Sequence, residues 1–111
     1  MVDTYIEVTS KDFAEKVLNA SQLVLVNFYA GQSSSSQIQE PEFLAISKEY
    51  QDRIVFAKTD VTNNDDLISL WHIDGVPTMV FFKGGNEIYR IKGIMMRDKL
   101  RRQIEGVLLA S

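Results

Sequence analysis

The sequence contains no cysteine, which excludes a disulfide, a thiolate metal site and a thiol nucleophile anywhere in the chain. It has a single histidine, and its acidic residues lack the spacing of a calcium loop, so we expect no metal centre and no cofactor. No apolar run approaches the roughly 18 residues of a membrane span. Because the first residues also lack a signal-peptide pattern, the sequence favours a cytoplasmic location.

Positive charge is in short supply as well. Lys and Arg together number 12 against 15 Asp and Glu, and the net charge of −3 argues against a nucleic-acid partner, which usually requires a basic surface. The 111 residues are 45% apolar, enough for a core without disulfides or metals. We therefore expect one domain covering residues 1–111, present as a monomer or a weak dimer.

Strand and helix patterns alternate along the chain. The apolar run at 23–29 is typical of a strand buried on both faces, and Gly84-Gly85 indicates a hairpin between the last two strands. Ser10 is a candidate cap for the first helix. The sequence predicts an α/β domain with a central mixed sheet of about five strands and four flanking helices, with parallel strands in each strand-helix-strand unit. The predicted strands are 4–8, 23–29, 54–60, 78–83 and 87–91. The predicted helices are 10–18, a long helix that follows the serines and ends at about residue 50, 65–71 and about 97–109.

Four segments of the chain, taken together, resemble the thioredoxin family. They are the buried strand ending in Asn27-Phe28-Tyr29-Ala30, the helix that contains Pro41, the segment Gly75-Val76-Pro77-Thr78, and Phe82-Lys83 followed by two glycines. The resemblance extends from about residue 13 to residue 109 and implies the thioredoxin fold. It also implies that the proline matched by Pro77 is cis and faces the functional site.

The reactive segment of that family reads Trp-Cys-Gly-Pro-Cys, and the matching residues here are Gln32-Ser33-Ser34-Ser35-Ser36. Both cysteine positions are therefore serine, at Ser33 and Ser36. The buried acid that assists the second cysteine is matched by Asn27, whereas its usual neighbour is retained as Lys58. A serine hydroxyl neither ionises at neutral pH nor forms a mixed disulfide, so the chain as written has no catalytic residue for dithiol exchange.

The simplest role for the serines is to cap the helix that follows them. Ser34 and Gln37 have the spacing of a capping box. Phosphate binding at the helix start is an alternative, and a hydrolytic serine would need a base, which His72 is too distant to supply if the family fold holds. The last helix carries a basic cluster, either a solvated face or a docking site for an acidic partner, formed by Arg97, Lys99, Arg101 and Arg102.

Two functions stay open on the sequence alone. The first is a redox-inactive, chaperone-like or scaffold module that binds a protein or an extended peptide beside Pro77 through backbone pairing. The second is a thiol–disulfide oxidoreductase whose two cysteines have been replaced by serine. Because Gln32 and Asn27 depart from the family pattern too, the first is favoured. The groove positions that the resemblance implies are Gln32, Val61, Val76, Pro77, Gly93, Ile94 and Met95.

Overall fold

The computed structural model describes residues 4–111 and has a five-stranded sheet in the order β1-β3-β2-β4-β5. The predicted α/β architecture of about five strands and four helices is confirmed. The strands are β1 (Ile6–Glu7), β2 (Val24–Tyr29), β3 (Val55–Asp60), β4 (Thr78–Lys83) and β5 (Asn86–Lys92). The helices are η1 (Ala14–Leu18), α1 (Ser34–Tyr50), α2 (Asp66–Trp71) and α3 (Arg97–Ala110).

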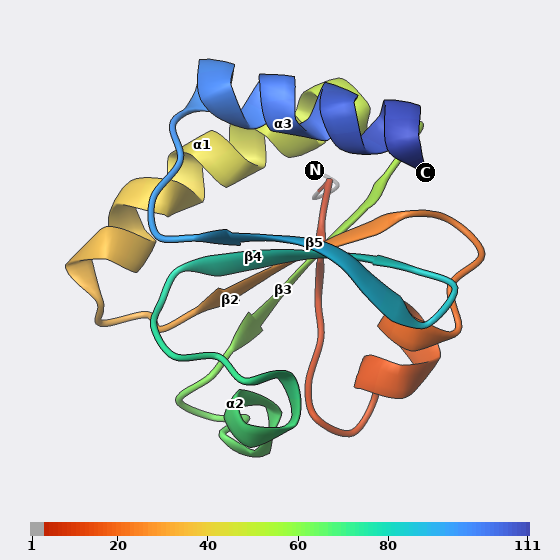
Figure 1. Ribbon diagram of the computed structural model, residues 1–111. Helices are drawn as coiled ribbons and strands as arrows, with labels where there is room; N and C mark the ends of the chain where they lie inside the picture. Colours follow the sequence, from red (N-terminus) through yellow and green to blue (C-terminus); the bar gives the residue numbers. More distant parts are fainter. Residues whose placement is uncertain (1–3) are drawn as a thin grey trace.

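The prediction that β4 runs parallel to β3 is wrong. Strands β1 and β2 both pair in parallel with β3, but β4 is antiparallel to β2, and β5 is antiparallel to β4. Helix α2 has six residues and rises only about 9 Å, whereas a six-residue strand spans about 20 Å. It therefore cannot carry the chain back along β3. It lies instead over the same face of the sheet as η1, and Figure 1 shows it joining the end of β3 to the start of β4.

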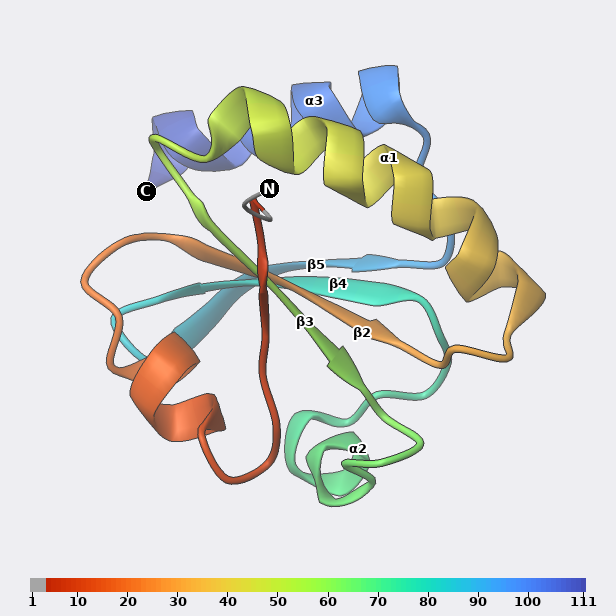
Figure 2. The ribbon, with the colours of Figure 1, turned by 180° about the vertical axis from the view of Figure 1, so that it is seen from behind.

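Two apolar layers enclose the sheet. Helices α1 and α3 cover one face, and η1 and α2 lie over the other (Figures 1 and 2). Central strand β2 supplies both layers, because Leu25 packs toward α1 and α3 while Val26 packs toward η1 and α2. The largest fully buried side chains of the two layers include Phe28, Phe43, Phe56, Phe81 and Phe82.

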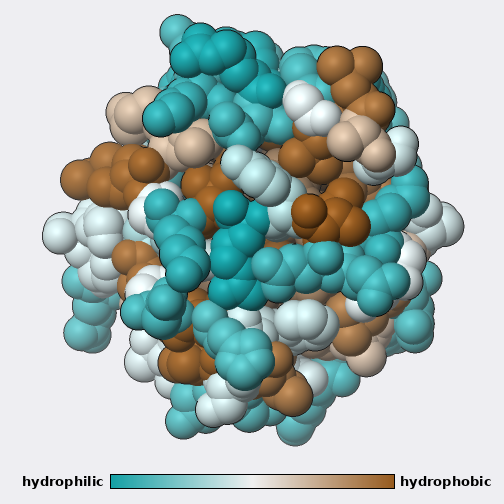
Figure 3. All heavy atoms as spheres, in the orientation of Figure 1, coloured by the Kyte–Doolittle hydropathy of each residue, from teal (hydrophilic) through white to brown (hydrophobic). Residues whose placement is uncertain are grey.

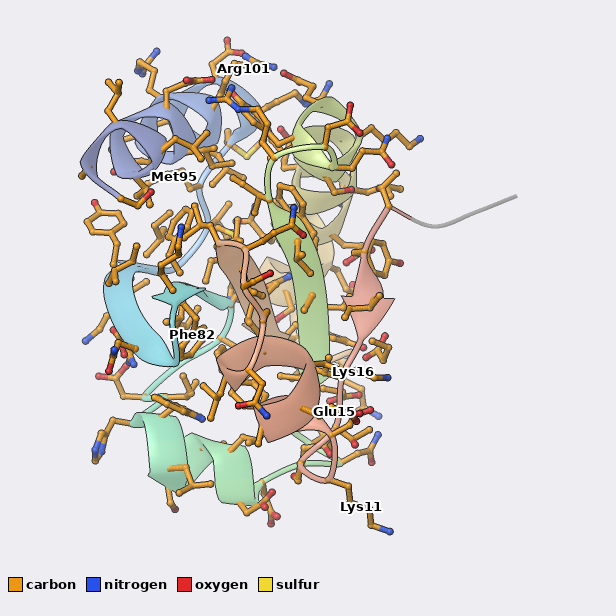
Figure 4. The ribbon with its side chains drawn as sticks, turned by 90° about the vertical axis from the view of Figure 1, so that its right-hand side faces the viewer. Lys11, Glu15, Lys16, Phe82, Met95 and Arg101 are labelled. Carbon is orange, nitrogen blue, oxygen red and sulfur yellow. The ribbon has the colours of Figure 1, made fainter. Side chains whose placement is uncertain are left out.

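The first helix is shorter than predicted, and Ser10 does not cap it. Helix η1 has five residues with π-type hydrogen bonding, and its charged residues Glu15 and Lys16 lie on the outside (Figure 4). The Ser10 N–H donates to Asn64 Oδ1 at 2.9 Å, and its hydroxyl bonds to Asp66. Ser10 therefore ties the segment before η1 to the start of α2.

Replacing Phe43 with alanine tests the layer beneath α1 and α3. The Phe43 ring is fully buried, with its centroid 5.6 Å from that of Phe56, so we expect the free energy of unfolding to fall by about 3–5 kcal/mol in urea denaturation. Leu109→Ala is the control, because Leu109 is 89% exposed and its truncation is expected to change stability by no more than about 0.5 kcal/mol. Equal losses in the two variants would contradict the packing described here.

Candidate functional site

The serine segment links the end of β2 to the start of α1. Ser33 has extended backbone, and its Oγ accepts the Ser36 N–H at 3.3 Å, which makes Ser33 the cap of α1. Capping by a serine is thus confirmed, but the predicted capping box of Ser34 and Gln37 is wrong. The Gln37 amide instead reaches back to donate to the Gly31 carbonyl at 2.9 Å. The cap lies one residue earlier because the chain turns at Gly31 before it enters the helix.

Three of the four serine hydroxyls are hydrogen-bonded within the protein. Ser35 Oγ donates to the Val76 carbonyl at 3.1 Å and lies 3.0 Å from Ser33 Oγ, and Ser36 Oγ accepts the Ala30 N–H at 3.2 Å. Within residues 4–111, none of these hydroxyls bonds to an imidazole or a carboxylate. A serine nucleophile with a general base is therefore not supported.

The segment before β4 forms the opposite side of the site. The Val76–Pro77 peptide bond is cis, and Pro77 is buried. The Pro77 carbonyl accepts the Gly93 N–H at 2.9 Å, so the end of β5 lies beside the proline. Gly93 has φ of +83°, a conformation that glycine adopts without steric cost. The structure thus brings together three of the predicted groove residues, Val76, Pro77 and Gly93, with the serine segment alongside.

A buried glutamine fixes the neighbouring loop. The Gln39 side chain, in the inner stripe of α1, accepts the Met95 N–H at 2.7 Å and donates to the Met95 carbonyl at 3.0 Å. Met95 therefore packs partly against the core, while Ile94 and Met96 remain 40% and 54% exposed. Figure 4 places Met95 on the segment that enters α3, and Figure 3 shows apolar surface over that segment.

Sequence reasoning missed Gln39, although a signal was present. Gln39 falls in the helical stripe that contains Phe43 and Ile46, where an apolar residue is expected, so a polar residue there predicts a buried hydrogen-bonding task. Two other predicted groove residues contribute less than expected. Val61 is only 7% exposed and belongs to the core, and exposed Gln32 has no hydrogen bond to the rest of residues 4–111.

Asn27 and Lys58 are direct neighbours across β2 and β3, as the resemblance implied, yet they do not bond to each other. The Asn27 side chain is fully buried, and neither amide atom has a partner within residues 4–111. Lys58 Nζ lies 3.2 Å from Glu40 and over the rings of Tyr5 and Tyr29, at 4.7 and 4.9 Å from their centroids. Glu40 on α1, another residue that sequence reasoning missed, is therefore the counter-ion of this lysine.

The contacts of Lys58 and Tyr29 determine the directions in which their pKa values shift. Burial by itself lowers the pKa of Lys58, but the charge of Glu40 and the contact of the ammonium with Tyr5 outweigh it, and the net result is a raised pKa. Burial, and a hydrogen bond to Glu7 at 2.7 Å, raise the pKa of Tyr29. At neutral pH the lysine is thus firmly protonated and cannot serve as a base for a serine hydroxyl.

Two of the four residues in the basic cluster on α3, Arg97 and Arg101, form ion pairs with carboxylates of α1. Arg101, which projects from α3 in Figure 4, bonds to Glu49 at 2.7 Å and to Asp98 at 2.8 Å. Glu42 accepts the Arg97 N–H at 2.8 Å and so caps α3 from outside the helix. These pairs favour a solvated face over a docking site for an acidic partner.

Comparison with known proteins identifies the family. A model of the family Thioredoxin matches residues 4–106, and the chain belongs to the thioredoxin family. It is 33% identical to "Thioredoxin X, chloroplastic" of Arabidopsis thaliana over 92% of this chain and 57% of that protein. It is 30% identical to "Thioredoxin C-2" of Corynebacterium nephridii over 95% of this chain and 97% of that protein. It also matches 22% of "Bifunctional thioredoxin reductase/thioredoxin" of Mycobacterium leprae, at 31% identity.

Residues 4–111 also lack two features that would point to other functions. No helix there has both the length and the apolar character to span a bilayer. The same residues hold no group of three or more histidine and acidic side chains arranged to bind a metal ion.

The unpartnered amide of Asn27 gives a stability prediction. Leucine has a similar size and no polar atom, so Asn27→Leu removes a desolvated amide without opening a cavity. We expect the free energy of unfolding to rise by about 1–2 kcal/mol in urea denaturation. Asn63→Leu, at an exposed position, is the control and is expected to leave stability within about 0.5 kcal/mol. A loss of stability in Asn27→Leu would show that solvent satisfies the amide in solution.

Proposed function

We propose that this protein is a redox-inactive member of the thioredoxin family that binds an extended protein segment in the groove beside Pro77. The observation that carries the proposal is that Val76 and Pro77 bond on one side to the serine segment, which contains no sulfur, and on the other side to Gly93. The binding surface of a family member is then present without the groups that perform exchange.

The chemistry of the serine segment supports a loss of redox function. Exchange requires a thiolate and a sulfur that can be attacked, and the Ser33 and Ser36 hydroxyls provide neither. Those hydroxyls are engaged instead as a helix cap and as an acceptor of the Ala30 N–H. Asn27 cannot transfer a proton as a carboxylate would. Ser33, Ser36 and Asn27 therefore each lack a group that disulfide exchange requires.

The groove itself has features that suit an extended segment. Within residues 4–111 the Val76 N–H has no hydrogen-bond acceptor, so it is free to donate to a carbonyl of a bound strand. Exposed Ile94 and Met96 belong to the loop that follows Gly93, whose N–H bonds to Pro77, and they offer apolar contact to the side chains of that strand. Gln39 holds the loop that carries them by bonding to Met95, which lowers the entropy lost on binding.

The second candidate is an oxidoreductase whose cysteines were replaced by serine. One observation favours it: Ser33 occupies the cap position of a 17-residue helix, where the helix dipole would lower the pKa of a thiol. The polar contacts of Gln39 and Glu40 favour the first candidate. Both residues lie outside the serine segment, so replacing two cysteines with serine would not introduce them.

Restoring both cysteines distinguishes the two candidates. We expect the unmodified protein to reduce insulin disulfides no faster than dithiothreitol alone, and Ser33→Cys/Ser36→Cys to form an internal disulfide but remain a slow reductase. Adding Asn27→Asp should raise its rate by about tenfold or more, because a carboxylate can accept the proton of the second thiol. The Ser33→Cys single variant, which cannot close the disulfide, is the control. Full activity of the double variant with Asn27 intact would favour the second candidate.

A charge placed in the groove tests binding. Ile94→Asp puts a carboxylate at an exposed apolar position, and we expect it to weaken binding of labelled, reduced and carboxymethylated α-lactalbumin, an unfolded chain, by roughly tenfold in fluorescence anisotropy. Ile88→Asp is the matched control, since Ile88 is 44% exposed in β5 and about 20 Å along the chain from Ile94. If both variants bind the probe as the unmodified protein does, the groove is not the binding site.

A further inference from the structure

We propose that Ser35 is an intramolecular latch on the groove: its hydroxyl bonds to the Val76 carbonyl that an extended segment uses for pairing, and it competes with the segment for that carbonyl. This inference rests on the proposed peptide binding and adds a mechanism that regulates it. The contact that carries it is the hydrogen bond of 3.1 Å from Ser35 Oγ to the Val76 carbonyl.

Every carbonyl beside the proline is already engaged. Gly75 O accepts the Thr78 hydroxyl at 2.6 Å, and Pro77 O accepts the Gly93 N–H at 2.9 Å. The Thr78 donor is in β4, and the Gly93 donor is the backbone group that directly follows β5. The Val76 carbonyl differs, because its donor is a side chain from the first turn of α1, 41 residues away in sequence. Among the three donors, Ser35 is the one side chain that is partly exposed, because the Thr78 side chain is buried and the Gly93 donor is a backbone group.

The serines form a chain of hydrogen bonds with one direction. Ser35 has a single hydroxyl proton, which goes to Val76 O, so in the 3.0 Å contact between Ser33 and Ser35 the proton comes from Ser33. Ser33 Oγ in turn accepts the Ser36 N–H at 3.3 Å. The chain of hydrogen bonds thus runs from the Ser36 N–H through the Ser33 and Ser35 hydroxyls to the Val76 carbonyl. Hydrogen bonds linked in this way strengthen one another.

The latch is able to open at little cost. A serine hydroxyl is redirected by rotation about one side-chain bond, with no change in the backbone. Ser35 is half-buried and therefore partly in contact with solvent, which can accept its proton once it leaves Val76. The carbonyl is then free to accept an N–H of a bound strand, while the adjacent Val76 N–H donates to it. The same residue thus pairs with the segment through both its polar backbone groups.

Side-chain variants at two neighbouring serines test this mechanism. We expect Ser35→Ala to bind labelled, reduced and carboxymethylated α-lactalbumin roughly two- to tenfold more tightly than the unmodified protein, because no internal donor competes for Val76. Ser35→Thr keeps a hydroxyl and should retain the original affinity. Ser34→Ala is the matched control, since Ser34 is exposed in the same turn and its hydroxyl has no partner within residues 4–111.

A second measurement does not depend on the probe. The carbonyl ¹³C chemical shift of Val76, read by nuclear magnetic resonance, should change in Ser35→Ala and stay constant in Ser34→Ala. An unchanged shift in Ser35→Ala would overturn the latch, as would equal or weaker binding by that variant. If the unmodified protein binds and Ser35→Ala binds equally, only the latch is wrong. If no variant binds the probe, the proposed peptide binding is wrong and the latch with it.

Discussion

Strand β2 has a hydrogen-bonded neighbour on each edge and an apolar layer on each face. Such a strand has no freedom to shift register, because a slip of one residue would exchange the side chains of the two layers. The residues that follow it are therefore held at a fixed place, where Tyr29 ends the strand and Ser33 caps α1. The serine segment, the proline segment and the loop before α3 are all positioned relative to that strand end.

Helix α1 begins at this strand end and positions the two segments that form the sides of the groove. On one side of the helix, Ser35 bonds to Val76, Gln39 to Met95, and Glu42 to the first turn of α3. These contacts reach the backbone of two segments that are distant in sequence. A hydrogen bond to a backbone group fixes the position of that part of the chain. Helix α1 therefore determines how far apart the segments that contain Val76 and Met95 lie. The hydrogen bonds of Ser35, Gln39 and Glu42 thus hold the two segments at fixed positions relative to α1 without a covalent link.

The sequence alone predicted most of the architecture and part of the site. Strands such as β2 and β4 were found because apolar runs and glycine turns are local signals, and the family resemblance located Val76 and Pro77. The direction of β4 and the positions of Gln39 and Glu40 were not found. Strand direction depends on how far a short connection reaches, and the roles of these two residues depend on groups that approach from other elements. Strand direction leaves no pattern in nearby residues, and the apolar stripe around Gln39 indicates a buried polar side chain without indicating which group it bonds to.

The amide at position 27 also alters how the fold responds to acidity. A buried carboxylate has a raised pKa and makes folding stability vary with pH near the range where it ionises, whereas an amide does not titrate. Among the groups facing this layer, Lys58 keeps a raised pKa, so its stabilising contribution is complete below pH 10.5 and is lost only as the solution becomes more alkaline than that. Neither Asn27 nor Lys58 therefore changes its charge as a neutral solution becomes mildly acidic or mildly basic.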